Sequence, residues 1–344
     1  MKNDKNLHAL RSIVAALIAA IFPFAGLAQD VSAPVAREQL SSPTEIVSYP
    51  SAFVVGEALP KWSQGYLIAY RRDTAPSDTE ANLRVFDRKG TLVTQTRLWF
   101  QGASLLRVKD IAVSRDGRLG VVGIAIDASG SLAGFLADIT LSTEPRAKII
   151  QTSPFEGQSV AYAPDGTIWM LGYQVGPSRL LSNDEPDHFI VEHLASDGVL
   201  KGEHLKRSSL HCAENPAATS HGGFPRILTS EDRIGLFLPA CDSWVELKPS
   251  GDVIGRWQWS NNNQNREVVT VAMTAGNNVY ARVESPQIGL FRLDKENSDW
   301  VPVNTDAARL AGAPFGWLQG SDGDKLVYHT KARLVWAKPS SQSN

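Results

Sequence analysis

The 344-residue sequence has little cysteine and no block of positive charge, and both shortages narrow the classes of protein to which it can belong. Two cysteines, Cys212 and Cys241, are too few for a metal site built of thiolates alone, and their spacing does not match a zinc finger. The formal net charge is −2, and lysine and arginine form no long block. A sequence of this kind offers no electrostatic surface for nucleic acid or for anionic lipid.

Signatures of common enzymes are missing as well. The chain contains no Gly-x-Ser-x-Gly nucleophile elbow, no His-Glu-x-x-His pair, no Walker loop and no Gly-x-Gly-x-x-Gly turn. We therefore assign no catalytic residue, no metal ligand and no cofactor from the sequence. After the first 28 residues no hydrophobic run is long enough to span a bilayer, so we expect no membrane insertion of the mature chain.

The N-terminus has the three parts of a secretory signal peptide. Lys2, Lys5 and Arg11 accompany an almost wholly apolar stretch from Ser12 to Leu27, and small residues stand at the −3 and −1 positions of a cut after Ala28. We expect residues 1–28 to be removed on export, which places the protein in the periplasm or outside the cell. The polar residues 29–43 are expected to form a flexible lead-in.

From about residue 44 short apolar runs alternate with turn residues, which is typical of an all-β domain. Two segments, Asp110–Gly123 and Ser159–Gly172, share a pattern of apolar strand, Asp-Gly turn and second apolar strand ending in glycine. Further turns near residues 65, 233, 276 and 323 complete a set of six, spaced by about 50 residues apart from one longer gap before 233. This period predicts a six-bladed β-propeller over residues 44–338, followed by a tail at 339–344.

The first and last strands predict how the ring of blades closes. The final repeat stops after Arg333–Ala337, one strand short of a blade, whereas Glu45–Tyr49 is a strand ahead of the first blade. Pairing these two strands would complete the sixth blade and leave no long edge exposed. We also expect tryptophans within strands to pack between blades. These are Trp169, Trp244, Trp317 and Trp336.

The Asp-Gly phrases at 112–123 and 161–172 resemble units of NHL-type and SMP-30-like six-bladed propellers. The resemblance covers the repeats of roughly residues 45–338 and implies the fold. Enzymes of the SMP-30-like group use a metal held by acidic and amide side chains in the central channel. Their ligand motifs cannot be matched residue by residue in this sequence, so the resemblance does not carry an activity over.

The longest gap between repeats predicts a disulfide. In a four-stranded blade, the connection to the next blade's inner strand and the loop between that blade's second and third strands lie on one rim. Cys212 lies in the first kind of loop and Cys241 in the second, and export supplies an oxidising compartment for their pairing. Polar residues close to this pair are our candidate binding residues. They are His211, His221, Arg226 and Asp242.

Three functions fit this sequence. The leading hypothesis is a non-catalytic propeller that binds a protein, a small molecule or a glycan on one face. The alternatives are a metal-dependent enzyme of the lactonase or sugar-processing kind and a structural component of an envelope complex. A metal enzyme should direct carboxylates and amides inward from several blades. The candidate inner strands are instead mainly apolar, with charges only at their starts (Asp110, Arg226, Arg266 and Glu267), which favours binding.

Overall fold

The computed structural model describes most of the chain from Glu38 onward. The described residues are 38–48, 58–175, 187–212, 215–220, 223–259, 267–285, 288–306, 317–330 and 333–341. The predicted signal peptide and the candidate residue His221 lie outside them. The described part consists mainly of strands, with two short 3-10 helices, η2 (Arg207–Leu210) and η3 (Pro239–Cys241). Within it, no helix has the length and apolar character needed to cross a membrane.

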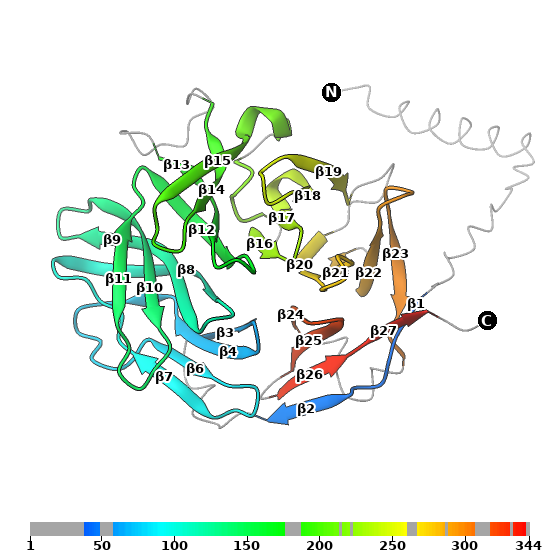
Figure 1. The fold of residues 1–344 in the computed structure, drawn as a ribbon, viewed down its shortest axis with the longest axis horizontal. Coiled ribbons are helices and arrows are strands. Elements are labelled where there is room, and N and C mark those ends of the chain that lie inside the picture. Colours follow the sequence, from blue (N-terminus) through cyan, green and yellow to red (C-terminus); the bar gives the residue numbers. More distant parts are fainter. Residues whose placement is uncertain are drawn as a thin grey trace, which may run out of the picture. The chain divides into compact units, whose positions relative to one another are not determined.

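The strands form six sheets arranged around a common axis as the blades of a propeller, which confirms the predicted fold (Figure 1). From the inside outward, blade 1 contains β3 (Ala58–Ser63), β4 (Tyr66–Arg71), β6 (Leu83–Phe86) and β7 (Leu92–Thr96). Blade 2 contains β8 (Ala103–Val113), β9 (Arg118–Asp127), β10 (Leu132–Thr140) and β11 (Ala147–Gln151), with the short β5 (Asp73–Thr74) beside β8. Blade 3 contains β12 (Phe155–Tyr162), β13 (Ile168–Gln174), β14 (Phe189–Leu194) and β15 (Leu200–Lys206).

The remaining three blades follow the same order. Blade 4 contains β16 (Arg226–Thr229), β17 (Ile234–Leu238), β18 (Ser243–Leu247) and β19 (Val253–Gln258). Blade 5 contains β20 (Glu267–Met273), β21 (Val279–Ser285), β22 (Gly289–Asp294) and β23 (Asp299–Asn304). Blade 6 contains β24 (Trp317–Asp322), β25 (Lys325–Thr330), β26 (Arg333–Ala337) and β2 (Glu45–Ser48). Each inner strand contacts the inner strand of the next blade, and β24 contacts β3, so the ring is closed.

The N-terminal strand β2 closes the ring in the predicted way. It pairs antiparallel with β26, so that Glu45 lies opposite Trp336 and Ser48 opposite Arg333. Arg88 of blade 1 then contacts this closing blade twice, at 2.5 Å from Glu45 Oε2 and 2.7 Å from Asp322 Oδ2. The closure therefore combines backbone pairing with ion pairs to the next blade.

The predicted limits of the propeller need correction at both ends. Residues 38–40, expected within the lead-in, form β1, and residues 339–341, expected within the tail, form β27 (Pro339–Ser341). These two strands pair with each other, and β1 also pairs parallel with β23, so both extend blade 5 outward. Leu40 is fully buried there, which gives this polar segment an apolar anchor that its composition did not suggest.

Apolar side chains fill the space between neighbouring blades. Each of the six neighbouring pairs shares one hydrophobic cluster, and each such cluster draws residues from two facing sheets. Trp169, Trp244 and Trp336 are buried in these clusters, as predicted. The prediction is wrong for Trp317, whose surface is 53% exposed, because it is the first residue of its strand and projects beyond the packed layer.

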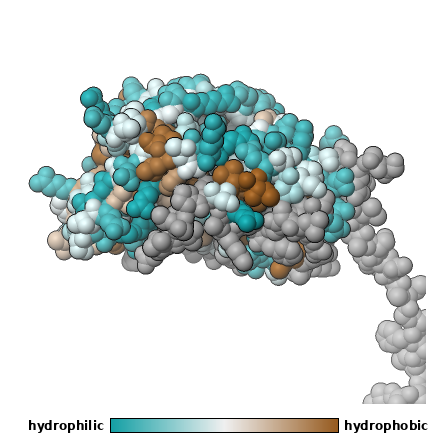
Figure 2. Space-filling view, turned by 90° about the horizontal axis from the view of Figure 1, so that it is seen from below, coloured by the Kyte–Doolittle hydropathy of each residue, from teal (hydrophilic) through white to brown (hydrophobic). Residues whose placement is uncertain are grey.

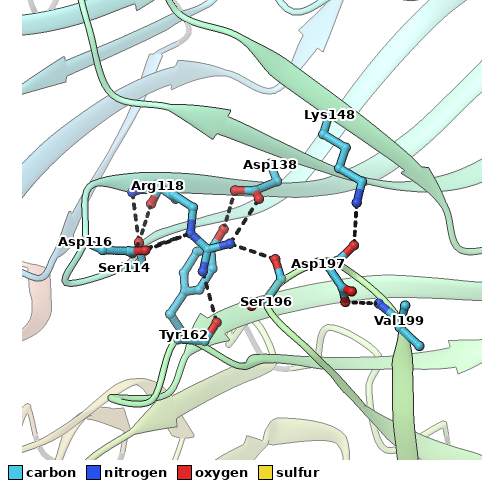
Figure 3. Close-up of polar contacts among 10 residues, drawn as sticks. Ser114, Asp116, Arg118, Asp138, Lys148, Tyr162, Ser196, Asp197 and Val199 are labelled. Atoms are coloured by element: carbon cyan, nitrogen blue, oxygen red, sulfur yellow. Dashed lines mark hydrogen bonds and ion pairs between the residues drawn. The ribbon is translucent and has the colours of Figure 1, made fainter.

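Polar contacts join blades 2 and 3 at the face where the first and second strands of each blade turn (Figure 3). Arg118 binds Asp138 Oδ2 of its own blade at 3.2 Å and lies over the Tyr162 ring of the next blade at 5.2 Å. Its guanidinium also donates to the backbone oxygens of Gly166 and Ser196, at 3.0 and 2.8 Å. One arginine thus bridges three segments of blade 3.

The edge of the ring is mainly hydrophilic, and its apolar residues form small separate patches in the view of Figure 2. Several of the exposed apolar side chains lie on outer strands, including Leu92, Ile149, Leu200 and Val253. Scattered exposure of this kind is normal for a protein surface.

The closure makes a testable prediction about stability. A chain that begins at residue 49, and so lacks β1 and β2, should lose stability in every blade, because blade 6 keeps an unpaired edge next to blade 1. Thermal unfolding of this variant should begin at a clearly lower temperature than that of a control chain beginning at Glu38. Equal midpoints for the two chains would contradict closure by β2.

Candidate functional site

Four of the inner strands carry a β-bulge at the same level of the ring. The extra residue is Lys109 in β8, Gln158 in β12, Val269 in β20 and Gln319 in β24, where the pairing with the second strand shifts by one position. A bulge bends its strand and changes the direction of a side chain, and bulges often occur beside functional sites. All four bulged residues line one cavity at the axis of the propeller.

The glycines that end the two clearest sequence repeats make room for these bulges. Gly123 lies opposite Val108 and Gly172 opposite Gly157, directly beside the bulged positions. A Cβ on Gly123 would lie 2.2 Å from the carbonyl oxygen of Arg107, and one on Gly172 would lie 2.1 Å from that of Glu156. Any larger residue would push the inner strand away, so the repeat glycines help to direct Lys109 and Gln158 into the cavity.

The cavity has a volume of about 440 Å³ and receives side chains from all six blades. It lies at the face where the inner strands begin. Its charged residues are Lys61, Arg72, Lys109 and Arg226, which are cationic, and Asp110, the one carboxylate among the described lining residues. A second, smaller cavity of about 90 Å³ lies toward the other face. Lys61, Arg226 and Gln319 line both cavities and therefore separate them.

Asp110 forms the centre of a hydrogen-bond network at the floor of the cavity. Lys61 Nζ of blade 1 lies 2.5 Å from Asp110 Oδ1, and Ser159 Oγ of blade 3 donates to Oδ2 at 2.5 Å. The backbone N–H of Val160 also donates to Oδ2, at 3.1 Å. Ser159 Oγ in turn accepts from the N–H of Ile227 in blade 4 at 3.1 Å. One carboxylate thus connects the inner strands of four successive blades.

Burial and neighbouring charges affect the titration of the floor residues. Burial lowers the pKa of Lys61, and Arg226 lowers it further, whereas Asp110 raises it. Burial also raises the pKa of Tyr70 well above its usual value, so its phenol stays protonated. Burial lowers the pKa of His329, which keeps this imidazole neutral near pH 7. At neutral pH the phenol of Tyr70 and the imidazole of His329 are therefore both uncharged.

Arg226 crosses the channel. It starts β16 in blade 4, and its Nη1 donates to the backbone oxygen of Gln319 in blade 6 at 3.3 Å. The Gln319 side chain is only 7% exposed, and its Oε1 has no hydrogen-bond partner among the described residues. Gln158 Nε2 is buried and unpaired within the same part of the chain. Buried polar atoms without partners are costly, so these two amides are suited to receive a ligand.

The predicted disulfide is confirmed. Cys212 and Cys241 are bonded, with their Cα atoms 5.1 Å apart. Cys212 follows η2 in the connection between blades 3 and 4, and Cys241 ends η3 between β17 and β18, as the topology predicted. The same connection supplies Thr219, Phe224 and Pro225 to the cavity wall. The disulfide therefore fixes the loop that forms one side of the cavity.

The other candidate residues have different positions. Arg226 lines the cavity, whereas His211 and Asp242 are not among its described lining residues. His211 is exposed and precedes Cys212, and Asp242 follows Cys241; both have left-handed backbone conformations after their 3-10 helices. The disulfide thus brings their backbones together on the rim, outside the cavity. Among the described residues, no three His, Cys, Asp or Glu side chains are grouped as metal ligands would be.

Sequence reasoning found part of this site. Asp110 and Arg226 stood out as charges at the starts of inner strands, and both are in the cavity. It missed Lys61, which lies just ahead of the predicted turn near residue 65, and the bulged residues Lys109, Gln158 and Gln319. The only sequence signal for the bulges is the pair of repeat glycines, which also serve as ordinary strand ends in many proteins.

Comparisons with known proteins support the fold and leave the site unassigned. No protein family and no curated protein matches the sequence. Among solved structures, a protein of Bacteroides fragilis is 11% identical over 91% of this chain and 98% of its own, with a TM-score of 0.52. The aldose sugar dehydrogenase of Streptomyces coelicolor with bound PQQ is 16% identical over 90% of this chain and 100% of its own, with a TM-score of 0.46. Virginiamycin B lyase of Staphylococcus aureus is 12% identical over 86% and 98%, with a TM-score of 0.42. At these identities the similarity concerns the propeller fold alone.

The role of the repeat glycines can be tested by substitution. Gly172→Ala should destabilise the protein by about 1–3 kcal/mol, because the new methyl group overlaps the backbone of β12. Gly276→Ala is the control, since a Cβ there would meet only ordinary contacts at 3.5 Å or more. Urea unfolding measures both variants. Similar stabilities for Gly172→Ala and Gly276→Ala would show that the bulge in β12 does not depend on glycine.

The disulfide makes a second prediction. In the double variant Cys212→Ser/Cys241→Ser, hydrogen exchange should become faster in the connection of residues 207–225, while the inner strands of blades 1 and 6 keep their slow exchange. Chain-entropy estimates for a loop of this length give a loss of stability of about 3–4 kcal/mol. Unchanged exchange in the connection would mean that packing of Leu210 and Ala217 alone holds the cavity wall.

Proposed function

We propose that this protein is an exported ligand-binding propeller that holds a small polar molecule in the cavity at the start of its inner strands. The observation that carries the proposal is the pair of buried, unpaired amide atoms, Gln158 Nε2 and Gln319 Oε1, on the wall of that cavity. A volume of about 440 Å³ lies within the range of small-molecule sites, roughly 300–1,000 Å³. The residues that face the cavity come from six separate blades, which gives many independent contacts in a small space.

Export is the second part of the proposal. The N-terminal sequence has the pattern of a signal peptide, and the Cys212–Cys241 disulfide suits an oxidising compartment. The resemblance of the Asp-Gly repeats to NHL-type and SMP-30-like propellers concerns the fold and stays a prediction. The sequence suggested a ligand on one face of the propeller without saying which face. We now propose the face where the inner strands begin, with the ligand in the cavity beside the disulfide-linked loop.

Binding is favoured over metal-dependent catalysis by the state of Asp110. Both of its oxygens are already occupied, one by Lys61 and the other by Ser159 and the N–H of Val160. A metal ion on this carboxylate would have to displace Lys61 and break the connection between blades. Hydrolysis of a lactone that is lost on chelation would nevertheless support the enzyme alternative, and it can be measured on the same protein.

The proposal predicts the effect of a cavity substitution on affinity. A thermal-shift screen of organic acids, amino-acid derivatives and sugars should identify stabilising compounds, whose affinities are then measured by calorimetry. Gln158→Leu should weaken the best of them by about 5- to 10-fold, the value of one hydrogen bond. Gln174→Leu removes the same group from the outer end of β13, away from the cavity, and should leave the affinity unchanged. Absence of any stabilising compound, or equal affinities in the two variants, would contradict a site in this cavity.

A further inference from the structure

The charge of the cavity indicates what kind of ligand it takes. Among the described residues, four cationic side chains and one carboxylate line it, and the carboxylate of Asp110 is already paired with Lys61. Within the same part of the chain, the Arg226 guanidinium donates to a neutral acceptor, the backbone oxygen of Gln319. Asp110 attracts this guanidinium, but in the part that the structure describes its carboxylate forms its ion pair with Lys61 and not with Arg226. The guanidinium therefore keeps donors for a ligand, and guanidinium groups bind carboxylates and phosphates in two-pronged geometry.

The two unpaired amides add a second requirement. Gln158 offers an N–H donor and Gln319 a carbonyl acceptor, and both atoms are buried. Both lie close to the arginine. The backbone oxygen of Gln319 accepts from Arg226, and Gln158 precedes Ser159, which accepts from the N–H next to Arg226. A group that both accepts and donates one hydrogen bond, placed beside an anion, would satisfy all three residues.

The cavity also has an apolar part. Phe224 and Trp317 line it and are each about half exposed, at 51% and 53%. An arginine lies against each ring: Arg72 is 5.9 Å from the centre of Phe224, and Arg282 is 5.6 Å from that of Trp317. Aromatic rings held in this way favour stacking of a flat or apolar group and leave polar atoms to the floor of the site.

We propose, on the basis of the binding function above, that the ligand is an N-acylated amino acid, free or as the C-terminal residue of a short peptide. Its carboxylate binds Arg226, its amide C=O and N–H meet Gln158 and Gln319, and its side chain lies between Phe224 and Trp317. An amide one carbon away from a carboxylate carries an anion, an acceptor and a donor on separate atoms within a short span, as the separate residues Arg226, Gln158 and Gln319 require. Lys109 and Arg72 add attraction for the anion at the wall of the cavity.

A matched series of ligands tests this proposal on the unmodified protein. N-acetyl-phenylalanine should bind, and N-acetyl-phenylalanine amide, which lacks the charge, should bind about 10- to 100-fold more weakly. 3-Phenylpropionate keeps the charge and ring but lacks the acylated nitrogen, and it should lose about 10-fold. Glucuronate tests whether any carboxylate with several hydroxyl groups suffices. Calorimetry measures all four. Equal binding of the acid and its amide, or tighter binding of glucuronate, would overturn the proposal.

Variants assign the contacts. Arg226→Gln should reduce the preference for the acid over its amide to about 2-fold or less, whereas Arg115→Gln, on the exposed turn between β8 and β9, should preserve the full preference. Gln319→Leu should instead remove the preference for N-acetyl-phenylalanine over 3-phenylpropionate.

If Arg226→Gln fails to fold, the ligand series and Gln319→Leu still test the proposal. A different compound that binds and depends on Gln158 would refute this ligand class and leave the proposed function intact, whereas failure of every compound would refute both.

Discussion

The carboxylate of Asp110 is the contact on which the centre of the propeller depends. It accepts hydrogen bonds from Lys61 in blade 1 and from Ser159 and Val160 in blade 3. The Ser159 hydroxyl in turn accepts a hydrogen bond from a backbone N–H of blade 4. Without this charge Lys61 and Arg226 would face each other across a narrow channel. Removing one partner of a buried ion pair typically costs about 3–5 kcal/mol of folding stability. Asp110 therefore both neutralises the positive charge at the floor of the cavity and holds the inner strands at their spacing.

The bulges make the rest of the site possible. A strand without bulges alternates its side chains strictly between its two faces, which in a propeller are the two interfaces with neighbouring blades. The extra residue at Lys109, Gln158 and Gln319 interrupts this alternation and turns a side chain toward the axis. The ligand site is thus built by a local change of backbone geometry inside strands that otherwise serve packing.

The fold could be predicted from sequence because its signals are local and repeated. Asp-Gly turns, apolar runs and the missing last strand were enough to predict six blades, their closure and the disulfide. The site was only half predictable, because period-two alternation places Lys109, Gln158 and Gln319 on blade interfaces, and a bulge leaves little trace in composition. The error at Trp317 has a similar origin, since residue type predicts burial only where a neighbouring layer covers the position. The strands β1 and β27 were missed because each has three residues and pairs far away in sequence.

Closure by the first strands has a consequence for the order of events in folding. β2 pairs with β26, and β1 pairs with β27 at the very end of the described chain. Neither contact can form until residues 333–341 have been synthesised, so the ring stays open while the earlier blades are being made. Until then the earlier blades belong to an open ring. A chain whose ring is still open can pass through a narrow pore. The same pairing that secures the finished propeller therefore delays its completion, which suits the export proposed above.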